Sequence, residues 1–199
     1  MLIQNCTVID CVGDVMPGAS VQIRDGLIQS VSPGPTEGAA GEEILDANGG
    51  FVLPGLINLH AHINRRHLSR GGGAFRQGAP AVENSSDGIR MLYAARNAWY
   101  ELSSGVTSIR DLCSVGRTAS ELKKAIGEGL IRGPRLHVCG MGIASTGGHE
   151  THRYKGAVEV DGPDEVAKAT RYELKLGADF IKLMVSGGLG GMPEHEHPS

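Results

Sequence analysis

Two histidines one residue apart, His60 and His62, follow a short apolar run at residues 56–59. Such a run favours a strand, and residues two apart along a strand point to the same side, so both imidazoles could reach one metal ion. Two histidines on a solvated loop are the alternative, since a bare His-x-His pair is common. The segment 53–59 ahead of the pair fixes both a strand and its direction. We therefore predict that His60 and His62 bind a divalent metal ion.

A lysine, Lys182, lies inside another apolar run at residues 180–185. Burying an ammonium group is costly unless the group is paired or its pKa falls. The amine could reach solvent at the strand end, or it could form a Schiff base with a substrate. It could also take up carbon dioxide and become a carbamate, which is an anionic ligand with two oxygens. The histidine pair upstream favours the carbamate.

A third histidine, His149, ends a run of small residues at 144–148. Small residues let a substrate approach the backbone closely, so His149 is a candidate to contact the substrate. A loop histidine without a role is the alternative. Arg153 and Tyr154 lie nearby and are weaker candidates.

Two further groups of polar residues carry weaker signals. Asp111 ends a predicted strand, at the height where barrel enzymes place functional groups, yet it could instead pair with Arg110 or Arg135. The run Glu194-His195-Glu196-His197 has metal-binding residue types, but it follows a glycine-rich segment and is predicted to be a solvated loop.

The residues before the histidine pair are predicted to form a small antiparallel sheet. Alternation and turn signals indicate strands at residues 2–9, 20–24 and 27–31 and a short returning strand at 43–45. Asp25-Gly26 is a strong hairpin signal between two of them.

After Gly50 the pattern changes to alternating strands and helices. The predicted strands are 56–59, 106–109, 135–139 and 180–185, and the predicted helices are 88–103, 119–130 and 163–176. The first helix should present one face made of Met91, Leu92, Ala95, Ala98, Trp99 and Leu102, and the third an inner face of Val166, Thr170 and Leu174. Such alternation implies a parallel sheet covered by helices.

An open doubly wound sheet and a (β/α)8 barrel both fit four such units. No Gly-x-Gly-x-x-Gly follows the first strand, which counts against a dinucleotide-binding fold. Chemistry at the strand ends favours the barrel. We therefore predict an α/β fold, the first half of a (β/α)8 TIM barrel at residues 51–199, preceded by a partial β-sandwich domain at residues 1–50.

Residues 50–62, Gly50-Phe51-Val52-Leu53-Pro54-Gly55-Leu56-Ile57-Asn58-Leu59-His60-Ala61-His62, resemble the barrel signature of the amidohydrolase superfamily. Residues 105–111 and 133–136 resemble its second and third strands. The small β segment resembles the part-sandwich domain that those enzymes build from both chain ends. The run before His149 resembles a substrate-binding loop of members related to prolidases and imidazolonepropionase.

The resemblance implies a ligand set and a reaction. In binuclear members, the lysine that matches Lys182 is carboxylated and bridges two metal ions, so two zinc ions, His60, His62 and a carbamate are expected. His149 is expected to contact the scissile carbonyl or the substrate carboxylate. Two more histidines and an aspartate general base would lie past Ser199, because a full barrel needs roughly 250 residues.

The predicted activity is hydrolysis of a carbon–nitrogen bond. A dipeptide of the Xaa-Pro kind or an N-acyl amino acid is the expected substrate, and a cyclic amide or the deamination of a ring is the alternative. The alternative to an enzyme is that these residues form a half-barrel that has no activity of its own. In that case two unpaired apolar strand edges would lead to assembly with another chain.

The amino-acid composition limits the kinds of partner that the protein is expected to bind. A net charge of −3 gives no electrostatic reason to expect binding to nucleic acid or to a membrane surface. No apolar stretch approaches the ~20 residues of a membrane helix, and Met1-Leu2-Ile3-Gln4-Asn5 does not resemble a secretory signal, so a cytoplasmic homo-oligomer is expected. Cys6, Cys11, Cys113 and Cys139 are scattered and are predicted to be reduced core residues.

Overall fold

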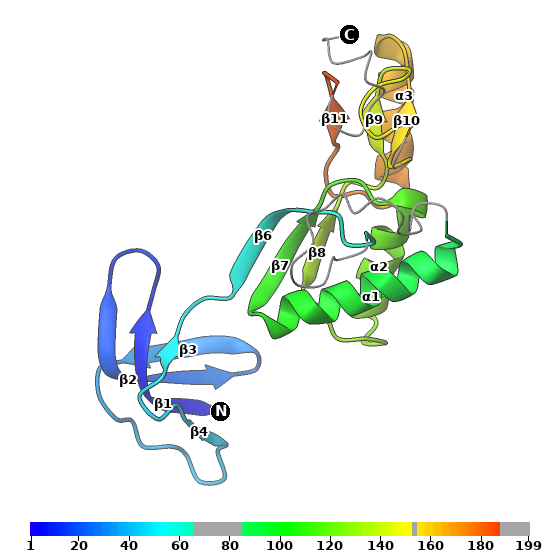
Figure 1. Cartoon of the computed structure of the whole chain (residues 1–199). Coiled ribbons are helices and arrows are strands. Elements are labelled where there is room, and N and C mark those ends of the chain that lie inside the picture. Colours follow the sequence, from blue (N-terminus) through cyan, green and yellow to red (C-terminus); the bar gives the residue numbers. More distant parts are fainter. Residues whose placement is uncertain (66–84, 153–154, 188–199) are drawn as a thin grey trace, which may run out of the picture. The chain divides into compact units, whose positions relative to one another are not determined.

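The computed structural model describes residues 1–65, 85–152 and 155–187. The chain divides after Gly55 into two compact units, Met1–Gly55 and Leu56–Ser199 (Figure 1). Each unit is described by itself.

The first unit is a five-stranded sheet in the order β3-β2-β1-β4, with β5 also paired to β1. Its strands are β1 (Leu2–Ile9), β2 (Val15–Arg24), β3 (Leu27–Ser32), β4 (Ile44–Asp46) and β5 (Phe51–Val52). The predicted turn joins β2 to β3, and both Asp25 and Gly26 have a positive φ, 54° and 73°, as a type I′ hairpin turn requires. Cys6, Val8, Ala19 and Val21 form the core of this unit.

The prediction of a purely antiparallel sheet is wrong, because β4 and β5 run parallel to β1. The connection through residues 33–43 brings the chain back to Leu2, and β4 then begins opposite that residue. The second strand also begins earlier than predicted, at Val15, and β5 was not predicted at all.

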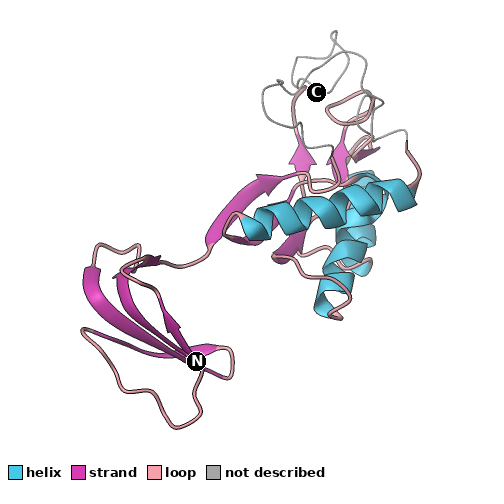
Figure 2. Cartoon of the chain, turned by 60° about the horizontal axis from the view of Figure 1, so that its bottom comes forward, coloured by secondary structure: helices cyan, strands magenta, loops and turns pink. Residues whose placement is uncertain are grey.

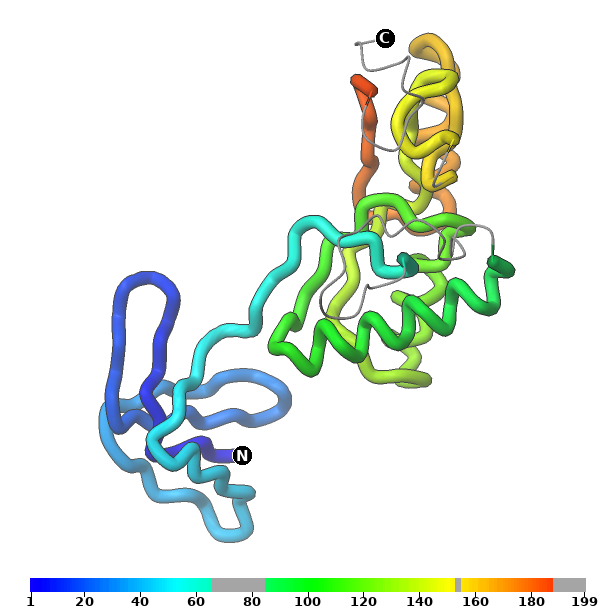
Figure 3. Tube along the Cα trace, in the orientation of Figure 1, coloured from blue at the N-terminus to red at the C-terminus, as the bar shows by residue number. Residues whose placement is uncertain are grey.

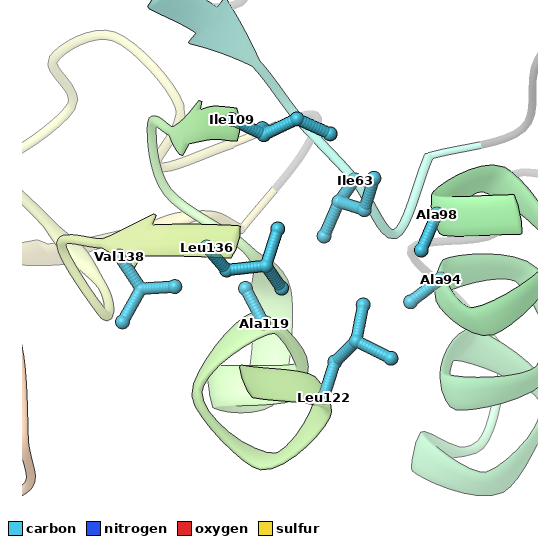
Figure 4. Close-up of a cluster of buried hydrophobic side chains, with 8 residues drawn as sticks. All are labelled: Ile63, Ala94, Ala98, Ile109, Ala119, Leu122, Leu136 and Val138. Carbon is cyan, nitrogen blue, oxygen red and sulfur yellow. The ribbon is translucent and has the colours of Figure 1, made fainter. Parts of the chain in front are cut away.

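The second unit begins with three parallel strands, β6 (Leu56–Ala61), β7 (Val106–Asp111) and β8 (Arg135–Val138), hydrogen-bonded in that order. The connections include α1 (Asp87–Ser103), the 3-10 turn η2 (Val115–Arg117) and α2 (Thr118–Gly127). Figure 2 shows both helices alongside the strands. The core between them consists of Ile63, Ala94, Ala98, Ile109, Ala119, Leu122, Leu136 and Val138 (Figure 4).

Helix α1 starts at a Ser86 cap, whose side chain accepts a hydrogen bond from the backbone N–H of Ile89. Its buried residues are Ala94, Asn97 and Ala98. The predicted inner face is therefore wrong at Leu92 and Trp99, which are 67% and 51% exposed. At about 100° per residue, these two side chains point away from the side that carries Ala94 and Ala98.

The remaining elements form a second parallel sheet in the order β10-β9-β11. They are β9 (Gly142–Ala144), β10 (Ala157–Glu159), α3 (Pro163–Lys175) and β11 (Leu183–Met184). Strands β9 and β10 were not predicted, and the predicted strand 180–185 is regular only at β11. Figure 3 lets the reader follow the backbone from β8 into β9 through the short segment 139–141.

The predicted inner face of α3 is also partly wrong. Leu174 is 49% exposed, and the buried residue of this helix is Glu173. The Glu173 carboxylate pairs with Arg117 at 2.6 Å and accepts a hydrogen bond from the backbone N–H of Met141. This ion pair joins segments that are distant in the sequence, and it decides which side of α3 faces inward. A hydrophobic pattern cannot reveal such a pair.

All four cysteines are free. Cys6, Cys113 and Cys139 are buried as predicted, whereas Cys11 is exposed. Within the described part of the chain, no helix combines the length and the apolar character needed to cross a membrane.

Candidate functional site

The predicted metal-binding histidines lie at the end of β6. His60 is the last residue but one of the strand, and His62 directly follows its last residue, Ala61. The two ring centroids are 5.5 Å apart and the ring planes meet at 71°. The imidazoles are therefore neighbours, as residues two apart along an extended chain should be. Their binding of a metal stays a prediction.

The surroundings of both histidines favour the neutral ring. Burial, followed by the positive charge of Arg65, lowers the pKa of His62 to about 4. Burial also lowers the pKa of His60, and the charges of Lys182, Arg110 and Arg65 add to this effect. A neutral imidazole keeps a lone pair on one ring nitrogen, and this is the form that binds metal ions.

The backbone of Cys113 selects the free nitrogen of His62. Its carbonyl oxygen lies 3.3 Å from His62 Nδ1, and a carbonyl can only accept a hydrogen bond. Nδ1 therefore carries the proton, which leaves Nε2 free as a ligand. Burial raises the pKa of the Cys113 thiol, so this residue acts here through its backbone rather than as a thiolate.

Lys182 immediately precedes β11 instead of lying within a long strand. Its carbonyl oxygen accepts a hydrogen bond from the backbone N–H of Ile143 at 2.9 Å, which ties it to β9. The side chain is half-buried, and its charge is the second cause of the lowered pKa of His60. The charge of Lys182 therefore acts on His60, although 122 positions separate the two residues in the sequence.

Asp111 pairs with neither of the arginines suggested by the sequence. It is completely buried and accepts hydrogen bonds from the backbone N–H of Ile63 at 2.7 Å and from the hydroxyl of Ser114. Arg110 and Arg135 form hydrogen bonds elsewhere. Burial raises the pKa of Asp111 to about 6. Asp111 thus fixes the chain directly after His62.

Asn97 fixes the same segment from α1, and we did not predict this from the sequence. Its side-chain amide donates hydrogen bonds to the carbonyl oxygens of Ile63 and Arg65, at 2.7 and 2.6 Å. The sequence did contain one indication of this role: Asn97 lies on the same helix face as the buried residues Ala94 and Ala98. A buried amide needs hydrogen-bond partners, so its position already indicated a polar contact with another segment.

His149 follows β9 in a loop that bends back at Gly148, whose N–H donates a hydrogen bond to the carbonyl oxygen of Ser145. The side chain of His149 is 30% exposed, and its Nε2 lies 3.5 Å from Glu150 Oε1. Glu150 in turn forms an ion pair with Arg65 from the segment after β6. The loop of His149 is therefore connected to the segment that carries His62.

The other residues named from the sequence lie outside the described residues. These are Arg153, Tyr154 and the run 194–197. Among the described residues, no group of three or more His, Cys, Asp or Glu side chains could hold a metal ion. The two histidine rings are neighbours, and Lys182 acts on His60 through its charge.

Residues 51–199 match the sequence profile of the amidohydrolase family. The chain belongs to the amidohydrolase family. This result confirms the resemblance recognised in residues 50–62, and it covers all of the predicted site residues.

Individual members of the amidohydrolase family show the same relationship. Ochratoxinase from Aspergillus niger is 31% identical over 175 residues, covering 74% of this chain and 33% of the relative. A crystal structure of a Xaa-Pro dipeptidase with methionine in its active site matches with a TM-score of 0.81 and 30% identity, over 94% of this chain and 47% of that chain. Imidazolonepropionase from Myxococcus xanthus is 47% identical over 51 residues, covering 24% of this chain and 12% of the relative.

The chain spans a third to a half of the length of the relatives that it matches over most of its residues. Its second unit is a partial α/β domain of the amidohydrolase type, with six strands in two parallel sheets among the described residues. The donor set fits a divalent metal in part: it contains two adjacent imidazoles whose surroundings favour the neutral form, and His62 has its Nε2 free.

Proposed function

We propose that the protein, at its native length, is a metal-dependent hydrolase of carbon–nitrogen bonds whose metal ligands in this chain are His60, His62 and Lys182. The observation that carries the proposal is the adjacent pair of imidazoles, both favoured in their neutral form, in a chain of the amidohydrolase family. The expected cofactor is a pair of zinc ions. When bound, they would lower the pKa of a water molecule and polarise the carbonyl of the substrate.

Lys182 would act as a carbamate. The lone pair of the neutral amine attacks the carbon of carbon dioxide, an N–C bond forms while the electron pair of one C=O π bond moves onto oxygen, and the nitrogen releases one proton to solvent. The product carries a negative charge over two oxygens, which suits two cations better than an amine does. The assignment is supported by the position of Lys182 directly before β11 and by the electrostatic effect of its side chain on His60.

His149 would bind the substrate. Its ring is partly exposed at the end of a loop with two consecutive glycines, Gly147 and Gly148, so a ligand could reach it. An imidazole N–H donates a hydrogen bond, which suits a scissile carbonyl or a substrate carboxylate.

We propose a dipeptide of the Xaa-Pro kind or an N-acyl amino acid as the substrate. The similarity to the Xaa-Pro dipeptidase extends over 94% of this chain, whereas the similarity to imidazolonepropionase covers 24%. Hydrolysis of a cyclic amide or deamination of a ring is the second candidate, and the short imidazolonepropionase match is the observation that favours it.

The proposal also covers the architecture, the assembly and the cellular compartment of the whole protein. Residues 51–199 would supply the first four β/α units of an eight-stranded barrel, and residues 1–50 would be part of a composite sandwich domain. A homo-oligomer is proposed as the assembly. The cytoplasm is proposed as the compartment, because the four cysteines are scattered along the sequence without a paired spacing.

The test uses the native-length protein loaded with zinc. We expect release of amino acids from Xaa-Pro dipeptides or N-acyl amino acids, loss of this activity with a chelator, and recovery when zinc is returned. Turnover of cyclic amides or aminated rings alone would favour the second candidate. A metal-loaded protein that turns over neither class would refute the proposed function.

A further inference from the structure

Glu150 is a buried carboxylate for which the proposed reaction has no role. Its side chain is 3% exposed, and its backbone has a φ of 69°, in the left-handed region that side chains other than glycine rarely adopt. Both features cost free energy, and strained backbone concentrates at functional sites. The surroundings of Glu150 must therefore hold it in place.

Two loops of the candidate site meet at this carboxylate. Oε2 forms an ion pair with Arg65, three residues after His62, and Oε1 lies 3.5 Å from Nε2 of His149. Gly156 closes the space on another side, because a Cβ atom there would lie 3.0 Å from Oε2. The charge of Glu150 also raises the pKa of Cys113, the residue whose carbonyl oxygen lies at His62.

We propose that Glu150 is a positioning residue that holds the imidazole of His149 toward the region of His62 by joining its loop to Arg65. The proposal rests on the proposed function, because it assumes that His149 meets the substrate. Glu150 itself need not touch the substrate. It holds one ring nitrogen of His149, Nε2, and leaves the other, Nδ1, available to the substrate.

Glu173 provides a matched control within the same unit. It is equally buried, at 1% exposed, and forms an ion pair with Arg117. It differs in two respects: it lies in the regular helix α3, and its partners are not part of the candidate site. A purely structural role for Glu150 predicts similar consequences when either carboxylate is neutralised.

The experiment is a double-mutant cycle in the native-length, zinc-loaded protein. Glu150→Gln should lower kcat/KM by about 10–100-fold, the range expected for partners that orient a functional group, while Glu173→Gln should change it by less than about 3-fold. In the His149→Asn background, Glu150→Gln should have no further effect, because residues that act as a unit are not additive. Effects that multiply, or equal effects of the two Gln variants, would overturn the proposal.

A second readout does not depend on substrate. With ¹⁵N-labelled histidine, Glu150→Gln should move the Nε2 resonance of His149, assigned by its loss in His149→Asn, and Glu173→Gln should leave it in place. An unchanged resonance in Glu150→Gln would refute the positioning role. A protein without amidohydrolase activity would refute only the proposed function, since this spectrum can still be recorded.

Discussion

The Nδ1 atom of His62 lies 3.3 Å from the carbonyl oxygen of Cys113, a residue 51 positions further along the chain. This contact determines which nitrogen of the ring is free, and it joins the segment after β6 to the segment after β7. A metal-binding histidine generally needs such a partner at its second nitrogen. The candidate site is thus oriented by backbone as well as by side chains.

Replacing either histidine should remove metal from the native-length protein. We expect His60→Ala and His62→Ala each to lower zinc content and to abolish hydrolysis, because each removes a neutral imidazole from the donor set. Zinc per chain can be measured by inductively coupled plasma mass spectrometry. His152→Ala, which removes an exposed imidazole, is the control and should retain full zinc. Full occupancy in both His60→Ala and His62→Ala would exclude this site.

Lys182→Ala should lower the zinc content to one ion per chain and remove most activity, with partial recovery in the presence of a short carboxylate such as acetate. Added carboxylate would supply the two oxygens that the carbamate provides. Lys175→Ala, at an exposed position of α3, should behave like the unaltered protein. Borohydride trapping of a substrate adduct on Lys182 would support a Schiff base instead and contradict the carbamate.

Asp111 should give stability a measurable pH dependence. Burial raises the pKa of its carboxyl from 3.8 to about 6 in the folded chain. Between these values the unfolded chain is ionised at this group and the folded chain is not. The stabilisation is therefore complete below pH ~4 and is lost as the pH rises through about 6, an effect on the order of 3 kcal/mol.

Urea unfolding of the native-length protein at several pH values tests this prediction. Asp111→Asn keeps an acceptor oxygen for the Ile63 N–H and should remove this pH dependence. Asp111→Ala loses the acceptor and should be less stable by about 1–3 kcal/mol across the range. If Asp111→Asn keeps the slope of the unaltered protein, the group responsible is another one.

The core of the second unit should be sensitive to a single truncation. Leu122 belongs to α2 and is fully buried in the core that α2 forms with β8 and α1. Leu122→Ala should lower the free energy of unfolding by about 2–5 kcal/mol. Leu130→Ala, at a side chain that is 72% exposed, should change it by less than about 0.5 kcal/mol. Similar losses in both variants would mean that the packing in Figure 4 is not the main stabilising core.

The 199 residues expressed alone should self-associate and bind zinc weakly. Leu56, Ile57 and Leu59 on β6 and Val185 beyond β11 are between 52% and 73% exposed, and β6 and β11 each pair with one strand only among the described residues. Exposed apolar strand edges recruit other chains. Light scattering combined with a zinc titration tests this, and a compact monomer that binds zinc tightly would contradict it.

The parts of the fold that could be predicted are those set by local sequence. Asp25-Gly26 predicted its hairpin because few residues adopt two successive positive φ values, and the spacing of His60 and His62 predicted neighbouring rings. The split of the third strand could not be predicted. It occurs at Gly140, beside the Glu173 carboxylate, and that contact joins residues 33 positions apart. The roles of Asn97 and Glu150 likewise depend on partners that only the folded chain brings near.

The break between β8 and β9 makes the candidate site a composite of two separately hydrogen-bonded sheets. The histidines belong to the sheet β6-β7-β8, whereas Lys182 adjoins β11 in the sheet β10-β9-β11. Residues 139–141 join β8 to β9, so their conformation affects the spacing between the histidines and Lys182. This joint has little freedom here, because a Cβ atom at Gly140 would lie 2.2 Å from Glu173 Oε2. A side chain at Gly140 would therefore have to displace Glu173, whereas Glu173→Gln keeps the shape of this contact.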